Sequence, residues 1–440
     1  HKRYSEGIMS IKNKVSDFIS QLQDDGENLF PYLANKDWKP GNNIYYSGPY
    51  WDEQEPIAAI TTLLNGNWLP AGEQVNKFEA RFGKKFDFRY NLMVNSGSSA
   101  NLVMIAALKK YFGWHDGDEI LVCACGFATT INPILQNNLK PVFVDIDYND
   151  LNWDLEMLES KITSRTRACF SSPVLGNPYD FDKFLEILDI YGLEYISDNC
   201  DSLGSKWRGQ FLTKHAVAAS CSFYPAHHIS TIEGGMVSSN IEEIIQIARS
   251  YAWWGRGCYC VGSQNKLPNG VCGQRFDRWL EGYDHDVDHK YVFGVQGYNL
   301  KPADLQGSIG LVQLTKQDEI HRIRRLNKTR LHEIFSKIDG ARVIEEKEHA
   351  ETSWFGVPIV YEGNKAQLVK YLEDNKIQTR NYFAGNILRH PGYKHLESYA
   401  NYPNSSKVLD NVFFLGCSPV ITDPMIDYIE EVVTKFRNEL

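Results

Sequence analysis

Two adjacent histidines, His227 and His228, follow Ser222 in the run Ser-Phe-Tyr-Pro-Ala-His-His-Ile-Ser-Thr-Ile-Glu-Gly-Gly. An imidazole changes charge near neutral pH, so it can take up or release a proton during a reaction. Unlike a lysine amine, it cannot hold an aldehyde as an imine. The pair therefore indicates proton transfer in a site without a covalent tether, although a lone histidine pair is more often a structural bystander.

A turn of small residues suits a phosphate group. Gly97, Ser98 and Ser99 stand where an expected strand ends and an expected helix begins. The free N–H groups and the dipole at such a helix start attract anions, and the hydroxyls add donors. Ser222 would complete this cradle. A turn that only caps its helix is the simpler alternative.

Two further residues suit a planar heteroaromatic ring. Phe127 could stack on the ring, and Asp198, just after an expected strand, could pair with a protonated ring nitrogen. The alternative for Phe127 is an ordinary core side chain, and the alternative for Asp198 is a helix cap.

Four of the nine cysteines are spaced like ligands of a metal centre. Cys258 and Cys260 are separated by one residue, Cys272 follows after eleven more, and Cys200 lies upstream. Four thiolates are the usual ligands of an iron–sulfur cluster or of structural zinc, and the residues alone leave both open. We expect the others to be buried, inert thiols: Cys123, Cys125, Cys169, Cys221 and Cys417.

These residues must be positioned by an α/β fold. After a helix over 11–23 and two helices around a turn in 55–82, short apolar runs alternate with helical patterns from residue 91 onward. The expected strands are 92–94, 119–123, 141–144, 168–170, 194–196, 218–223 and 235–238. The alternation predicts a mostly parallel central sheet sandwiched by helices, which binds its ligands at the carboxyl ends of the strands.

The chain divides into three expected parts: an N-terminal helical segment (1–54), a large cofactor-binding domain (55–314) and a small C-terminal α/β domain (315–440). Residues 251–291, rich in glycine, aromatic residues and cysteine, interrupt the large domain as an insertion. Residues 1–8 precede Met9 and are left out of the reasoning as an expected cloning remnant.

Composition excludes several classes of partner. The 440 residues are 43% hydrophobic, with a net charge of -9, a pI near 5.8 and no block of like charges. This balance argues against nucleic acid and anionic membranes as partners. With no apolar stretch near the roughly 20 residues of a membrane span, we expect a soluble, cytoplasmic protein.

Several motifs together resemble one family, and they run in its order from about residue 47 to the C-terminus. They are Gly66–Leu69, Ser96–Asn101, Leu175–Pro178, Asp198–Gly204, the His227 run, Gly297–Lys301 and Phe383–Asn386. The chain resembles the sugar-nucleotide aminotransferases and dehydratases, which are pyridoxal phosphate (PLP) enzymes of fold type I.

The resemblance implies roles for individual residues. Gly97, Ser98, Ser99 and Ser222 would hold the cofactor phosphate, Phe127 would stack, and Asp198 would meet the ring nitrogen. Asn177 and Asp201 would also bind the cofactor. His227 would be the catalytic base, because it stands five residues after the serine, as the lysine does in the aminotransferases. Lys301 or Asn299 would reach the cofactor phosphate of a neighbouring subunit in a homodimer, and His228, Tyr298 and Asn386 would bind substrate.

Within the family, the chain is most similar to 3-dehydratases that use pyridoxamine phosphate (PMP) and a [2Fe-2S] cluster. This implies C3 deoxygenation of CDP-4-keto-6-deoxyglucose for 3,6-dideoxysugars of lipopolysaccharide O-antigen, with an NADH-dependent flavin and iron–sulfur reductase as partner. Cys200, Cys258, Cys260 and Cys272 reproduce the cluster ligands. The last gap has eleven residues where the family has seven, so a longer loop is expected over 261–271.

Alternatives stay open at this point. A GDP- or dTDP-linked substrate is one, and the GDP-linked relatives lack the four cysteines. A PLP-dependent sugar aminotransferase is disfavoured, because neither position 227 nor 228 is lysine. A non-catalytic, zinc-bound protein on this fold is a third. The acidic and histidine-rich stretch 284–289 resembles a metal site but is better explained as a solvated or substrate-facing loop.

Overall fold

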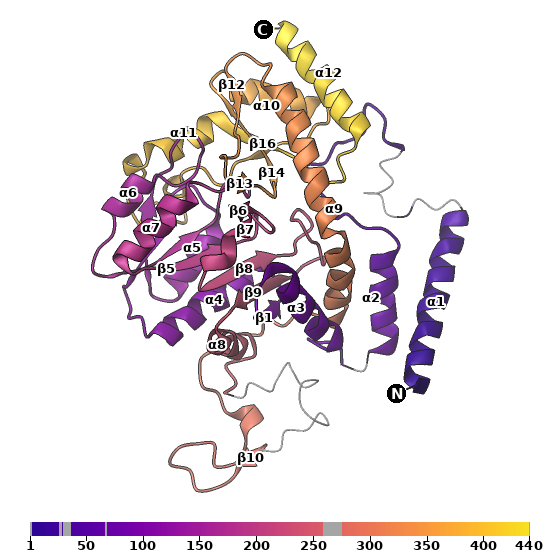
Figure 1. Cartoon of the computed structure of the whole chain (residues 1–440), viewed down its shortest axis with the longest axis vertical. Coiled ribbons are helices and arrows are strands. Elements are labelled where there is room, and N and C mark those ends of the chain that lie inside the picture. The colour runs from indigo at the N-terminus through magenta and orange to yellow at the C-terminus, as the bar shows by residue number, and fades with distance from the viewer. Residues whose placement is uncertain (1, 26–28, 30–36, 67, 258–274, 440) are drawn as a thin grey trace.

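The computed structural model describes residues 2–25, 29, 37–66, 68–257 and 275–439. A large part is built on a central sheet, and a smaller part, orange and yellow in Figure 1, lies at the C-terminal end. Helices α1 and α2 stand along one side of the large part. In the described ranges, no helix combines the length and the apolar character that a bilayer crossing requires.

The central sheet has the strand order β1-β9-β8-β5-β4-β2-β3. Its strands are β1 (Tyr90–Val94), β2 (Glu119–Cys123), β3 (Lys140–Val144), β4 (Thr166–Ser171), β5 (Glu194–Asp198), β8 (Ala218–Ser222) and β9 (Gly235–Ser239). All neighbours from β3 to β8 pair in parallel, whereas β9 runs antiparallel to β8 and β1. Strands β2, β8 and β9 are buried along their whole length, as expected for a sheet covered on both faces.

The helices of the large part pack on this sheet or on one another. They are α1 (Lys2–Asp24), α2 (Gln54–Asn65), α3 (Glu73–Phe86), α4 (Gly97–Phe112), α5 (Ala128–Gln136), α6 (Leu155–Ser160), α7 (Phe181–Tyr191) and α8 (Glu242–Ala252). Helix α4 packs on β8 and β9 and contacts α5 and α8, while α3 packs on β1. The mostly parallel α/β fold predicted from the alternation is confirmed.

The smaller part contains a second sheet in the order β12-β14-β16-β15, and all its pairs are antiparallel. Its elements are β12 (Ala341–Val343), β14 (Gly356–Tyr361), β15 (Arg380–Asn381), β16 (Val412–Gly416), α10 (Lys365–Asp374), α11 (Pro403–Asn411) and α12 (Asp423–Glu439). Helix α9 (Asp304–Phe335) packs on α2 and α3 at one end and on β12 and β14 at the other. It therefore runs through the position where we expected the boundary between 314 and 315.

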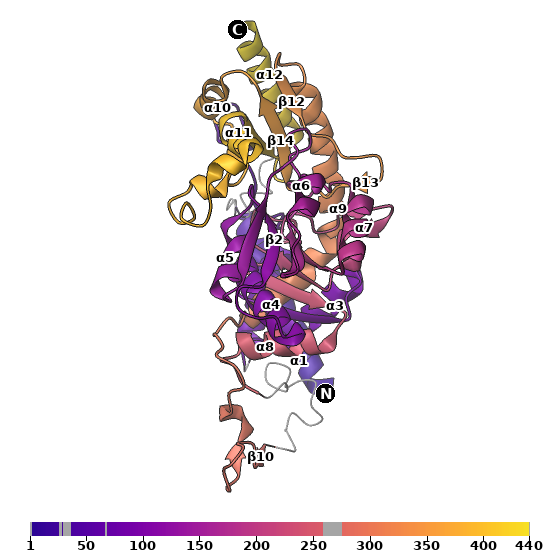
Figure 2. The ribbon, with the colours of Figure 1, turned by 90° about the vertical axis from the view of Figure 1, so that its left-hand side faces the viewer.

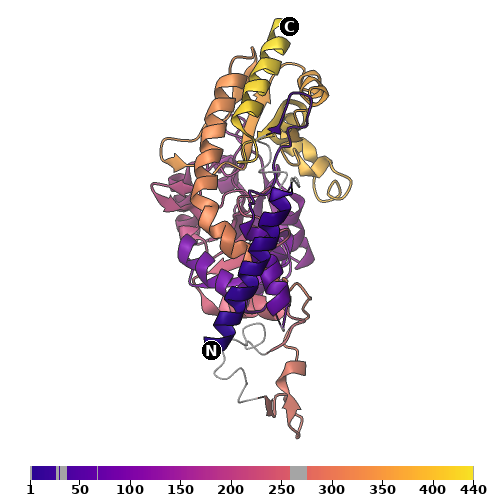
Figure 3. The ribbon, with the colours of Figure 1, turned by 90° about the vertical axis from the view of Figure 1, so that its right-hand side faces the viewer.

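Short elements complete the described chain. They are β6 (Lys206–Trp207), β7 (Gln210–Phe211), β10 (Phe276–Asp277), β11 (Val287–Asp288), β13 (Ala350–Glu351) and the 3-10 helices η2 (Leu212–His215), η5 (His289–Tyr291), η6 (Ile387–Arg389) and η7 (Tyr399–Asn401). Strand β13 joins β6 and β7 in a three-stranded sheet, which ties the smaller part to the larger one. The segment with β10 projects from the end of the molecule in Figures 2 and 3.

Candidate functional site

A cavity lies at the carboxyl ends of β5 and β8, beside the start of α4, where the sheet architecture predicts a ligand. It encloses about 180 Å³. Its lining comprises Tyr46, Gly97, Ser98, Asn101, Phe127, Thr129, Ser172, Asp198, Cys200, Asp201, Ser222, Tyr224, Ala226, His227, Phe355 and Phe383. The large part and the smaller part both contribute, since Phe355 and Phe383 lie beyond α9.

One end of the cavity suits an anion. Ser96 caps α4 by accepting a hydrogen bond from the N–H of Ser99 at 3.0 Å, and the hydroxyl of Ser98 donates to that of Thr129 at 3.0 Å. Gly97 packs so closely on Ser222 that a Cβ at this glycine would lie 2.5 Å from the Cβ of Ser222. The turn, the helix start and Ser222 thus form a tight polar concavity with free backbone donors.

Asp198 is held rigidly on the floor of the cavity at the end of β5. Its Oδ2 accepts hydrogen bonds from the amide of Asn101 at 2.9 Å and from the hydroxyl of Thr130 at 2.6 Å. Its Oδ1 accepts from the N–H of Cys200 at 3.2 Å. Only 4% of the residue is exposed. Three donors fix the direction of such a buried carboxylate, as pairing with a ring cation requires.

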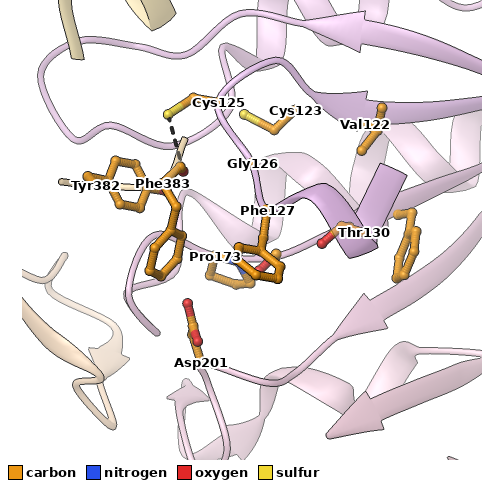
Figure 4. A pocket seen from close by; sticks show the side chains of 12 residues that line it. Val122, Cys123, Cys125, Gly126, Phe127, Thr130, Pro173, Asp201, Tyr382 and Phe383 are labelled. Atoms are coloured by element: carbon orange, nitrogen blue, oxygen red, sulfur yellow. Dashed lines mark hydrogen bonds between the residues drawn. The ribbon is translucent and has the colours of Figure 1, made fainter. Parts of the chain in front are cut away.

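Aromatic rings form the walls. Phe127, at the start of α5, is 51% exposed, and its ring meets that of Phe383 edge-on at 5.7 Å between centroids. Figure 4 shows these two rings with Asp201, Cys125 and Tyr382, all of which line an adjoining recess of about 20 Å³. A recess of this size holds about one water-sized group. The exposed face of Phe127 is available for stacking, as the sequence predicts.

His227 faces Asp201 across the cavity. Its Nδ1 lies 3.4 Å from Oδ1 of Asp201 without making a well-aligned hydrogen bond, and its ring packs at 5.0 Å on Phe355. Burial, followed by the nearby cation of Arg324, lowers the pKa of His227 to about 3. Burial, with the neighbouring carboxylate of Asp198, raises the pKa of Asp201 to about 8. At neutral pH the imidazole is therefore an uncharged base beside an uncharged acid.

Three predicted site residues have their hydrogen bonds away from the cavity. His228 is buried, with Nε2 at 2.9 Å from the carbonyl of Ser353. Asn177 donates to the carbonyl of Glu345, and Asn386 donates to the carbonyls of Tyr399 and Tyr402. The structure does not bring these three side chains to the described cavity lining.

Lys301, Asn299 and Tyr298 also lie outside the lining. The ammonium of Lys301 contacts the amide oxygen of Asn299 and stands 3.3 Å from the ring centroid of Trp254. Burial and the charge of Arg256 lower the pKa of Lys301 to about 8. In the described part of the single chain, these residues do not line the cavity.

Of the four predicted cluster ligands, Cys200 lines the cavity, whereas Cys258, Cys260 and Cys272 lie outside the described residues. Burial and the nearby carboxylate of Asp198 raise the pKa of the Cys200 thiol. The described ranges contain no group of three or more His, Cys, Asp or Glu side chains suited to a metal ion. Burial of the five remaining cysteines is confirmed: Cys123, Cys125, Cys169, Cys221 and Cys417.

Sequence reasoning missed several residues of the site. Asn101 and Thr130, the donors to Asp198, each lie within one helical turn of a predicted residue, so the helical period could have indicated them. Tyr46 and Phe355 carry no local signal, because only the tertiary fold brings them to the cavity. Tyr224 and Phe383 lie inside motifs identified from the sequence, but the motifs predict no role for them.

The donor set fits a pyridoxal-type cofactor. It combines an anion cradle, an aromatic wall and a carboxylate held by three donors. Among the described residues that line the cavity there is no lysine, and the Nδ1 of His227 is left without a hydrogen-bond partner. The cavity therefore suits a cofactor that is held by contacts rather than by a covalent bond.

Comparison with known proteins gives consistent matches. Residues 51–435 match the model of the DegT/DnrJ/EryC1/StrS aminotransferase family. The chain is similar to dTDP-4-dehydro-2,6-dideoxy-D-glucose 3-dehydratase of Saccharopolyspora spinosa, with 38% identity over 400 residues. The alignment covers 89% of this chain and 86% of that relative. It is 34% identical to the lipopolysaccharide biosynthesis protein RfbH of Salmonella typhimurium, covering 97% of the chain and 98% of that protein.

Among solved structures, an Escherichia coli GDP-4-keto-6-deoxy-D-mannose-3-dehydratase with bound hydrated PLP superposes with a TM-score of 0.77 at 31% identity. The match covers 89% of this chain and all of that one. The likeness confirms the fold type that the sequence motifs predict.

Proposed function

Because this chain belongs to the DegT/DnrJ/EryC1/StrS aminotransferase family, we propose that it is a PMP-dependent 3-dehydratase of a nucleotide-linked 4-keto-6-deoxyhexose. The observation that carries the proposal is the imidazole of His227 in the cavity, 3.4 Å from Asp201, where the described lining has no lysine. An aminotransferase that tethers its cofactor needs that lysine amine. Relatives named as 3-dehydratases support the same choice.

PMP would supply an amine that condenses with the ketone and a ring that withdraws electrons from the reacting carbons. The turn at Gly97 and Ser98, together with Ser222, would hold its phosphate. Asp198 would keep a proton on the ring nitrogen, since its own position is fixed by Asn101 and Thr130. His227 would remove the proton at C4′, so that the hydroxyl at C3 of the sugar can leave.

A homodimer follows from this proposal. Lys301 and Asn299 lie outside the cavity of their own chain, which leaves them available to the cofactor phosphate of a second subunit, and Tyr298 to its substrate. Sedimentation of the purified protein tests the assembly. A dimer is expected, and a monomer that turns over substrate would contradict it.

We also propose a [2Fe-2S] cluster on Cys200, Cys258, Cys260 and Cys272. The support is their spacing together with the place of Cys200 in the cavity lining. A cluster there would accept electrons singly from an NADH-dependent reductase. Elemental analysis of anaerobically purified protein should give two irons per chain, lost in Cys258→Ser. Zinc without iron would support structural zinc instead.

The nucleotide carried by the sugar distinguishes the remaining candidate substrates. We propose CDP-4-keto-6-deoxyglucose, whereas the relatives are named for dTDP and GDP sugars. Incubating the PMP-loaded protein with each of the three nucleotide sugars, followed by mass spectrometry, separates them. The true substrate should become joined to PMP with the loss of two waters, one from the condensation and one from the C3 hydroxyl, while release of a free amino sugar from any of them would instead identify an aminotransferase.

A further inference from the structure

Arg324 is a charged side chain in the core, in the middle of α9, and only 1% of it is exposed. Its guanidinium donates four hydrogen bonds to backbone carbonyl oxygens. Nη1 reaches those of Trp354 at 3.1 Å and Phe355 at 3.0 Å. Nη2 reaches those of Ala226 and His227, both at 3.2 Å.

Burying a cation carries a desolvation penalty of several kcal/mol, so good geometry must offset it. The four carbonyls belong to two segments that are far apart in the sequence. One is the turn after β8, and the other precedes β14. Both segments contribute to the cavity wall: Tyr224, Ala226 and His227 lie in the first, and Phe355 lies in the second. The planar guanidinium fixes the separation of the two segments, because its donors have a rigid forked geometry.

We propose that Arg324 is a positioning residue that sets the place of the His227 imidazole for proton transfer. It holds the carbonyl of His227 directly. It also holds that of Phe355, whose ring packs at 5.0 Å on the imidazole. The inference rests on the proposed role of His227 as the base. The proximity of the same cation is the second cause, after burial, of the lowered pKa of His227, which agrees with this contact.

Substitution Arg324→Lys tests the proposal in the full chain. A lysine keeps the charge, but its single ammonium has three protons and cannot span four carbonyls. Three quantities are measured: PMP affinity by absorbance, exchange of the C4′ hydrogen with deuterated solvent in the presence of substrate, and the crystal structure of the cofactor-free variant.

PMP affinity should stay within about threefold of wild type, because the phosphate cradle and Asp198 do not contact Arg324. The exchange rate should fall on the order of 10²-fold, the usual cost of a misplaced catalytic group. In the crystal structure, the separation of His227 Nδ1 from Asp201 Oδ1 should exceed the present 3.4 Å.

Arg249→Lys is the matched control. Arg249 is also buried, pairs with Glu79 and donates to the carbonyl of Asn91, and it does not line the cavity. The substitution Arg249→Lys should lower the melting temperature without slowing the exchange of the C4′ hydrogen. The proposal is overturned by any of three results. The first is a C4′ exchange rate in Arg324→Lys equal to that of wild type, and the second is an imidazole of His227 that keeps its position in the crystal structure of Arg324→Lys. The third is a C4′ exchange rate that falls as much in Arg249→Lys as in Arg324→Lys. If Arg324→Lys does not fold, Arg324→Gln replaces it, and failure of both would assign Arg324 to folding alone and overturn the proposal.

His227→Asn separates this inference from the proposed function. If His227→Asn exchanges as fast as wild type, the proposed base is wrong. If His227→Asn is inactive while Arg324→Lys behaves as wild type, only the positioning role is refuted.

Discussion

The substitution Gly97→Ala tests the anion cradle sterically. The new Cβ would lie 2.5 Å from the Cβ of Ser222, whereas ordinary contact begins at 3.4 Å. Ser222 and the first turn of α4 must therefore separate by about 0.9 Å. A hydrogen bond to a phosphate does not survive such a shift with good geometry.

Losing one charge-assisted hydrogen bond costs roughly 1.5–3 kcal/mol, which corresponds to a rise of about 10- to 150-fold in the dissociation constant of PMP. Alanine has the higher helix propensity, which offsets part of the clash. The cofactor-free protein should therefore lose less free energy of unfolding, seen as a lower melting temperature, than the free energy of PMP binding that is lost. Absorbance titration with PMP measures the affinity, and calorimetry measures the melting temperature.

Gly392→Ala is the control, because a Cβ there meets no atom within 4 Å. Ser222→Ala in addition to Gly97→Ala should not restore binding, because the clash involves the Cβ that alanine keeps. If Gly97→Ala binds PMP within threefold of wild type, the phosphate does not bind at this turn.

Other expectations follow from single contacts. Thr130→Val removes the 2.6 Å donor to Asp198 while keeping the shape, and PMP affinity should fall about tenfold or more in calorimetric titration; unchanged affinity would argue against a role for Asp198. Lys316→Met leaves Glu55, which is fully buried, without its cation, and urea unfolding should show a loss of about 3 kcal/mol; a loss under 1 kcal/mol would mean that the pair contributes little. In ¹⁵N-histidine spectra of the cofactor-free protein, His227 should stay neutral down to about pH 4, because its pKa is lowered to about 3; a midpoint near 6.5 would contradict the burial of its ring. Since the folded pKa lies below the unfolded value, the folded state should lose stability as the pH falls below about 6.5, and His227→Asn should remove that part of the loss.

The sequence predicts the parts of the site that a single strand or helix end defines. The Ser/Gly turn at Gly97 follows from a strand-to-helix transition and the carboxylate of Asp198 from the end of a strand, which puts both at one edge of the sheet. His227 follows from its spacing to Ser222. The direction of β9 is not predictable, because a short apolar run reads the same in both directions.

Contacts between distant segments could not be predicted. Phe355, Phe383 and Arg324 reach the site from beyond residue 300, and no local period marks them. His228 and Asn177 lie inside the motifs, yet their hydrogen bonds go to Ser353 and Glu345. A polar side chain in a motif can serve the ligand or satisfy a buried backbone group, and only the packed structure distinguishes the two.

The most direct test of the central claim is solvent exchange at C4′ of PMP in His227→Asn compared with wild type, each saturated with cofactor and with the keto sugar. Asparagine fills a similar space but cannot accept the proton. Incorporation of deuterium in the wild type and none above background in the variant is the predicted result. Equal incorporation in both proteins, or a covalent lysyl adduct of the cofactor in mass spectra of the wild type, would contradict it.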